Sequence, residues 1–95
     1  MKNSSNMRLI IAVVRDVDSE AVLQALLKEN FRVTRISSTG GFMRRGNATM
    51  LIGVETEKVQ AALALIRSSC SPVADPGIKR VSVFVLKIDR FEQIG

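Results

Sequence analysis

The chain has no histidine, tryptophan or tyrosine, and it has a single cysteine among its 95 residues. Without histidine it lacks the commonest general base and the commonest transition-metal ligand. A zinc site needs several cysteine or histidine ligands, so the composition argues against one. The single Cys70 excludes a disulfide within the chain and fits a cytosolic protein. No nucleophile–base pair is recognisable either, and we therefore predict a protein that is not an enzyme and has no metal or cofactor.

Long apolar runs are also missing. No segment approaches the roughly 20 apolar residues that span a bilayer. The segment Met1–Asn6 is polar and lacks the apolar centre of a signal peptide. We predict a flexible tail over residues 1–6 and a single domain over residues 7–95. A chain of this size has a small core and often gains burial by forming oligomers.

Acidic residues are the scarcer charge, with 9 Asp and Glu against 14 Lys and Arg, which gives a net charge of +5. The sequence pI is about 10.2, so the composition favours an anionic partner such as a nucleotide, a nucleic acid or a membrane surface. The basic residues are scattered, however, and the adjacent pairs are Arg44-Arg45 and Lys79-Arg80. A large nucleic-acid interface is therefore not indicated. Four phenylalanines are the only rings that could stack on bases.

The most unusual stretch of the chain is residues 40–47, which read Gly-Gly-Phe-Met-Arg-Arg-Gly-Asn. It holds three of the six glycines, a phenylalanine, two arginines and an amide. Glycine lets another group approach the backbone closely, and the ring and guanidinium groups suit an anionic, aromatic ligand. The alternative interpretation is a plain hairpin connection with a polar tip.

Hydrophobic patterning predicts six elements in the order strand, helix, strand, strand, helix, strand. The expected strands cover residues 8–14, 31–39, 47–54 and 81–86, and the first of them reads as a strand buried on both faces. The first helix is expected to be capped by Asp18 or Ser19 and to end at Asn30 in a left-handed conformation. The second is expected to be capped by Thr56 and to carry an apolar stripe that ends at Cys70.

The predicted strands at residues 31–39 and 47–54 carry the residues that bear on function. In the first, Arg32 and Thr34 share a face with Ile36, while Arg35 lies on the other. In the second, alternate residues from position 48 onward are apolar and predict a buried face. Gly53 interrupts this strand and suggests a bulge or a close neighbour.

The element order is that of an α+β, ferredoxin-like βαββαβ fold. Right-handed crossovers place both helices on one face of a four-stranded antiparallel sheet. The other face of the sheet still needs cover, and its apolar residues suggest a partner subunit.

Several segments resemble the PII-like cyclic-di-AMP receptor family, from about Met7 to Phe91. The segments are Asn30–Thr34, Ser38–Arg44, Gly46–Thr49 and Val83–Leu86, and the Thr-Gly-Gly-Phe run followed by Gly-Asn is the most specific part. The resemblance implies a cytoplasmic homotrimer that binds cyclic-di-AMP at its three subunit interfaces and signals without catalysis.

The resemblance also implies a set of ligand-binding residues. Arg32 and Thr34 would line the site from the second strand, and Asn47 would read an adenine edge. Gly53 would leave room for the base. The remaining predicted ligand contacts are Gly41, Phe42, Met43 and, from the C-terminal tail, Gln93. Read alone, each of these residues also fits an ordinary strand, turn or packing role.

The chain departs from the family pattern in three places. Met43 stands where leucine is usual, and Arg45 adds a charge beside Arg44. Only Ser71–Lys79 fills the gap where family members carry a long loop, so contacts made by that loop are in question. The alternatives are a PII-like trimer that senses another anionic nucleotide or is purely structural, and a small RNA- or single-strand-binding module. Signalling without catalysis also implies a downstream protein partner.

Overall fold

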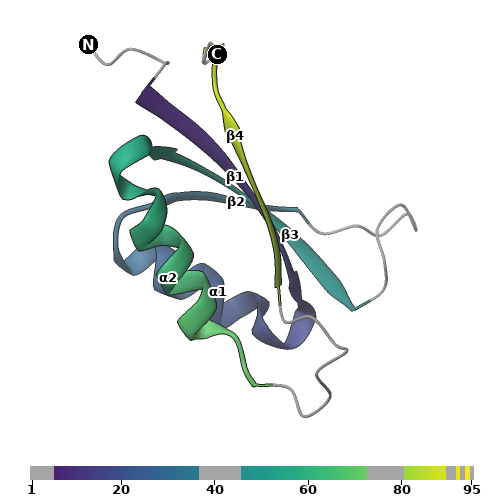
Figure 1. The fold of residues 1–95 in the computed structure, drawn as a ribbon. Coiled ribbons are helices and arrows are strands. Elements are labelled where there is room, and N and C mark those ends of the chain that lie inside the picture. Colours follow the sequence, from purple (N-terminus) through teal and green to yellow (C-terminus); the bar gives the residue numbers. More distant parts are fainter. Residues whose placement is uncertain (1–5, 37–45, 73–80, 90–91, 93, 95) are drawn as a thin grey trace.

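The computed structural model describes residues 6–36, 46–72, 81–89, 92 and 94. Within them the elements follow the predicted order (Figure 1): β1 (Met7–Arg15), α1 (Asp16–Lys28), β2 (Arg32–Ile36), β3 (Asn47–Glu55), the short 3-10 helix η2 (Thr56–Lys58), α2 (Val59–Ser69) and β4 (Val81–Lys87). Residues 1–5 of the predicted flexible tail and residues 40–45 of the glycine-rich segment lie outside the described residues.

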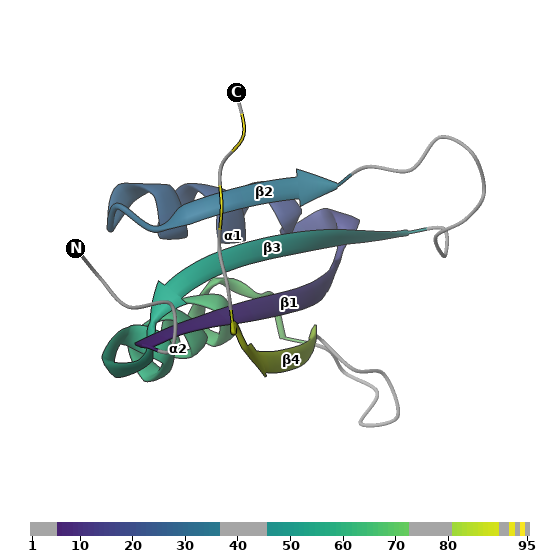
Figure 2. The same ribbon diagram turned by 90° about the horizontal axis from the view of Figure 1, so that it is seen from above.

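The four strands form one antiparallel sheet in the order β2-β3-β1-β4. In Figure 2 the strands lie side by side in front of the two helices, which cover one face. The longest pairing joins β1 to β3 along their whole length, from Met7↔Glu55 to Arg15↔Asn47. This arrangement confirms the predicted ferredoxin-like fold.

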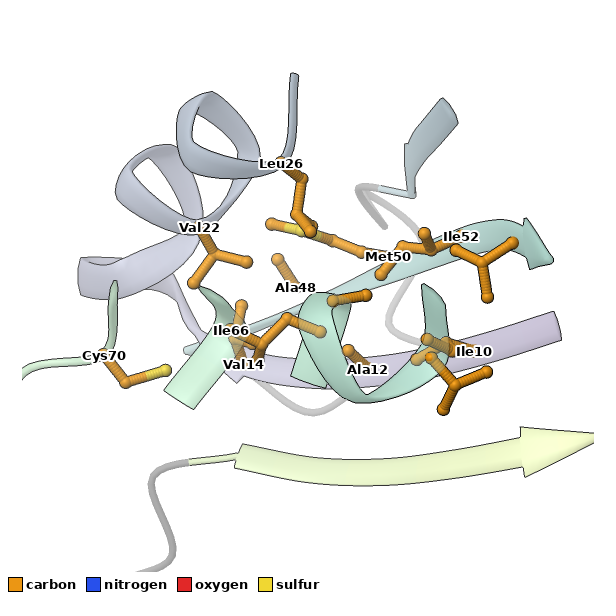
Figure 3. Close-up of a cluster of buried hydrophobic side chains, with 13 residues drawn as sticks. Ile10, Ala12, Val14, Val22, Leu26, Ala48, Met50, Ile52, Ile66 and Cys70 are labelled. Atoms are coloured by element: carbon orange, nitrogen blue, oxygen red, sulfur yellow. The ribbon is translucent and has the colours of Figure 1, made fainter. Parts of the chain in front are cut away.

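The core lies between the sheet and the two helices (Figure 3). It contains the alternate residues of β1 and β3 and the inner residues of α1 and α2: Ile10, Ala12, Val14, Ala48, Met50, Ile52, Val54, Val22, Leu26, Val59, Ala62, Ile66 and Cys70. The period-2 pattern of β3 predicted its buried face correctly. Within one chain the first strand is buried on one face only, because its other alternate residues are half-buried on the face that no helix covers.

That uncovered side, which we term the open face, is largely apolar. Register places Leu9 beside Gly53 and Leu86, and Ile11 beside Leu51 and Phe84. Phe84 is 57% exposed and Leu86 is 48% exposed. An apolar sheet face of this kind is typical of a surface that contacts another molecule.

The start of α1 differs from the prediction. Neither Asp18 nor Ser19 caps the helix, which begins at Asp16 directly after Arg15 and has no side-chain cap. Asp18 is instead 1% exposed and lies inside the first turn. Its Oδ2 accepts hydrogen bonds from Nε and Nη2 of Arg15 at 3.1 and 2.8 Å, and its Oδ1 accepts one from the Ser71 N–H at 2.9 Å.

Arg15, Asp18 and Ser71 therefore form a closed cluster, because the Arg15 Nη2 also donates to the Ser71 carbonyl at 2.7 Å. Burial alone would disfavour the charged form of Asp18, but the hydrogen bonds from Ser71 and Arg15 outweigh it and hold its pKa below the ordinary value. The cluster ties the end of β1 and the start of α1 to the residue that follows Cys70.

The end of α1 and the start of α2 also test the predictions. Asn30 has φ 66°, which confirms its left-handed conformation after α1. Thr56 does not cap α2, because η2 intervenes, and its Oγ1 donates instead to the Asn6 carbonyl at 2.8 Å. The apolar stripe of α2 is confirmed, with Leu63 packed at its margin.

Candidate ligand-binding pocket

A cavity of about 720 Å³ lies at the end of the sheet where β1 and β2 begin and β3 ends (the left end of the sheet in Figure 2). Residues from all four strands or their connections line it: Met7, Leu9, Glu29, Asn30, Phe31, Arg32, Thr34, Leu51, Gly53, Val54, Glu55, Lys58 and Ile88. Its volume lies in the range of small-molecule pockets, and apolar floors with a few polar groups are typical of such sites.

The apolar floor of the pocket follows from strand register. Arg32 pairs with Gly53 and Gly53 pairs with Leu9, so the three residues form one row on the open face. Thr34 and Leu51 form the next row. The alternation in β2 thus predicted correctly that Arg32 and Thr34 share a face.

Gly53 leaves space at the centre of this floor. A Cβ built there would meet no atom within 4 Å, and φ at this residue is not positive. The ladder runs through Gly53 without interruption, so the predicted bulge was wrong. No neighbour among the described residues approaches this glycine closely. The protein backbone therefore does not require glycine at this position. A ligand on the floor, however, would occupy the space that a larger side chain at position 53 would fill.

Arg32 is exposed at the edge of the pocket. Among the described residues it has no hydrogen bond or salt bridge. Arg35, three residues later on the opposite face, is engaged by Glu20 at 2.8 Å and by the Ser19 hydroxyl at 3.3 Å. The hydrogen bonds from Arg35 and Gln24 lower the pKa of Glu20. The guanidinium of Arg32 thus remains available for a carboxylate or phosphate.

Asn47 lies at the far end of the open face. It pairs with Arg15 and is six residues before Gly53 on the same strand, which corresponds to about 20 Å at 3.3 Å per residue. The preceding Gly46 has φ 84°, and its carbonyl accepts the Asp16 N–H at 2.7 Å. Within one subunit, the structure therefore brings Arg32, Thr34 and Gly53 together but not Asn47. Gly41, Phe42, Met43 and Gln93 lie outside the described residues.

A family model described as cyclic-di-AMP receptor matches residues 7–76, which is most of the chain. The chain belongs to the cyclic-di-AMP receptor family. This membership confirms the resemblance predicted from the glycine-rich segment. The match includes the whole of β1 to α2 and therefore the floor of the pocket.

Several solved structures share the fold of this chain. A protein of unknown function from Pediococcus pentosaceus is 32% identical, with 95% of this chain and 99% of that chain covered and a TM-score of 0.76. A PII protein of Arabidopsis thaliana bound to citrate is 23% identical over 88% of this chain and 78% of its own, with a TM-score of 0.64. A DUF3240 family protein from Shewanella baltica is 13% identical over 96% and 99%, with a TM-score of 0.69. The receptor thus has a PII-like fold.

Sequence reasoning missed four polar residues that line this receptor's pocket: Glu29, Asn30, Glu55 and Lys58. Asn30 lies directly before β2, and the left-handed φ that was predicted for it turns the chain into the pocket wall. Lys58 ends η2 and reaches the pocket from the connection between β3 and α2. The position of Asn30 could have been inferred from its spacing to Arg32, but the sequence offers no signal for Lys58.

No group of three or more Cys, Asp or Glu residues in the described ranges could hold a metal ion. None of the helices among these residues is long and apolar enough to cross a bilayer.

Proposed function

We propose that this chain is a non-catalytic signalling receptor that binds cyclic-di-AMP and acts in the cytoplasm without a bound cofactor. The observation that carries the proposal is the pocket that joins Arg32, Thr34 and Gly53 in a chain of the cyclic-di-AMP receptor family. The uncommitted guanidinium of Arg32 binds a phosphate in bidentate fashion. An adenine lies on the floor of Leu9, Leu51 and Gly53, and the Thr34 hydroxyl supplies a hydrogen bond.

The ligand lies between subunits in this proposal. Asn47 is about 20 Å from Gly53 along β3, so one dinucleotide contacts both only if two copies of the chain contribute to one site. Asn47 then reads the adenine edge from one subunit, together with Gly41, Phe42 and Met43. Gln93 closes the site from the C-terminal tail.

We predict that the chain forms a homotrimer in solution. The apolar open face, with Phe84 and Leu86 about half exposed, is the surface that the other copies cover. Light scattering is expected to give about three times the 10.4 kDa of one chain. A clean monomer at micromolar concentration contradicts the trimer.

Replacing Arg32 by alanine tests the ligand site. A charge-assisted hydrogen bond is worth roughly 1.5 to 3 kcal/mol, so Arg32→Ala is expected to weaken cyclic-di-AMP binding about ten- to a hundredfold in calorimetry. Arg35→Ala is the matched control, because it removes the same charge from the same strand but from the opposite face. Equal affinities of Arg32→Ala and the parent protein would refute this role.

One observation favours a second candidate, a PII-like receptor for a different anionic nucleotide. The described pocket supplies a cation and an apolar floor, while the adenine-reading Asn47 is distant within a subunit. Titration with a panel of cyclic dinucleotides and mononucleotides separates the candidates, since the second predicts that another nucleotide binds more tightly than cyclic-di-AMP.

A further inference from the structure

Four charged side chains line the pocket in the part of the chain that the structure describes. Glu29 and Arg32 come from the connection between α1 and β2 and from the start of β2, whereas Glu55 and Lys58 come from the end of β3 and from η2. Among these described residues the two acids balance the two bases in formal charge. The binding of an anionic ligand here therefore depends on where the individual cations lie.

Lys58 is as available to a ligand as Arg32. Its side chain is exposed, and in the described ranges it takes part in no hydrogen bond or salt bridge. Arg15 and Arg35, by contrast, both engage acidic side chains at 2.8 Å. A lysine ammonium is a compact charge with three donors on a flexible stem, which suits a phosphate whose position is not fixed by the fold.

We propose that Lys58 is the second phosphate-binding cation of this pocket and that, together with Arg32, it selects ligands with two separate anionic groups. The inference rests on the proposed function. Each phosphodiester of a cyclic dinucleotide carries one negative charge, so the two cations from different connections provide one partner for each. Without Lys58, Arg32 is the one cation that the described part of the lining offers, and the second phosphate loses its partner.

Glu29 makes the inference testable in both directions. It lines the same pocket and is exposed at the C-terminal end of α1, where a negative charge is unfavourable to the helix. Neutralising Glu29 should therefore leave the fold intact and strengthen the binding of a dianion, while neutralising Lys58 should weaken it.

The experiment compares the parent protein with Lys58→Met, Glu29→Gln and Arg67→Met by calorimetric titration of cyclic-di-AMP at low and high salt. Lys58→Met is expected to bind about tenfold more weakly at low salt, and the loss should shrink at high salt because exposed charges are screened. Glu29→Gln should bind about two- to fivefold more tightly, as expected for the removal of one exposed repulsive charge. Arg67→Met is the control, since it removes one positive charge from the last turn of α2, away from the pocket.

Four results overturn the inference. If Lys58→Met binds as tightly as the parent, or if Arg67→Met weakens binding equally, Lys58 has no specific role, although the proposed function stands. If Lys58→Met loses the oligomeric state of the parent in light scattering, the lysine acts in assembly instead. If the parent itself does not bind cyclic-di-AMP, both the inference and the proposed function fail.

Discussion

Gly53→Val is expected to weaken cyclic-di-AMP binding about a hundredfold or more while leaving the protein at least as stable as the parent. A Cβ at this position meets no protein atom within 4 Å, so the new side chain enters the pocket and not the core. Forcing extra methyl groups into an occupied site costs about 3 kcal/mol, which corresponds to a loss of affinity of about a hundredfold or more. Calorimetry measures the affinity.

Stability should change in the opposite direction. Glycine inside a strand is destabilising by roughly 0.5 to 1 kcal/mol relative to alanine, and valine suits a strand better still. Urea denaturation should therefore show a Gly53→Val protein that unfolds at an equal or higher denaturant concentration. Gly53→Ala serves as a graded control with an intermediate loss of affinity. A variant that binds like the parent, or that fails to fold, contradicts the view that this glycine serves the ligand and not the backbone.

Asp18→Asn is expected to give the largest loss of stability. One carboxylate oxygen of Asp18 accepts from Ser71 and the other from Arg15, whereas an asparagine amide has one acceptor and one donor end. The substitution therefore turns the new amide NH₂ toward either the Ser71 N–H or the Arg15 guanidinium. Both of these groups are donors, so one hydrogen bond is lost at a buried position. Breaking a buried ion pair on one side costs about 3 kcal/mol, to be measured as a decrease in the free energy of unfolding at pH 7. Glu20→Gln, which affects an exposed pair, should cost less than about 1 kcal/mol.

The loss should depend on pH. The folded-state pKa of Asp18 lies below its unfolded value, so the unfolded state binds more protons between the two. The stabilisation is fully present above the unfolded pKa of about 3.9 and disappears as the pH falls through the folded pKa. The stability difference between the parent and Asp18→Asn should therefore narrow in strong acid. A difference that is unchanged from pH 7 to below pH 3 or so would contradict an ionised Asp18 as its cause.

Local patterns in the sequence predicted the features that depend on local geometry. The period-2 alternation assigned the faces of β2 and β3, because adjacent side chains of a strand point to opposite sides. The left-handed Asn30 followed from its position after a helix. The glycine-rich segment indicated the family, although Phe42 and its neighbours lie outside the described residues.

Predictions failed where contacts distant in sequence decide the structure. Asp18 looks like a helix cap, but its carboxylate is buried and accepts a hydrogen bond from the N–H of Ser71, 53 residues away. Gly53 looks like a bulge because glycine weakens a strand, yet flanking pairs keep the ladder regular. Lys58 escaped notice because a lysine after a strand is ordinary, and only the fold places it near Arg32.

The most direct test of the proposed receptor is calorimetric titration of the intact protein with cyclic-di-AMP and, separately, with cyclic-di-GMP. Guanine has a carbonyl acceptor where adenine has an amino donor, so the account predicts one cyclic-di-AMP per subunit and binding of cyclic-di-GMP that is weaker by roughly a hundredfold or more. Absence of cyclic-di-AMP binding at about 100 μM, or equal affinity for the two dinucleotides, would contradict it.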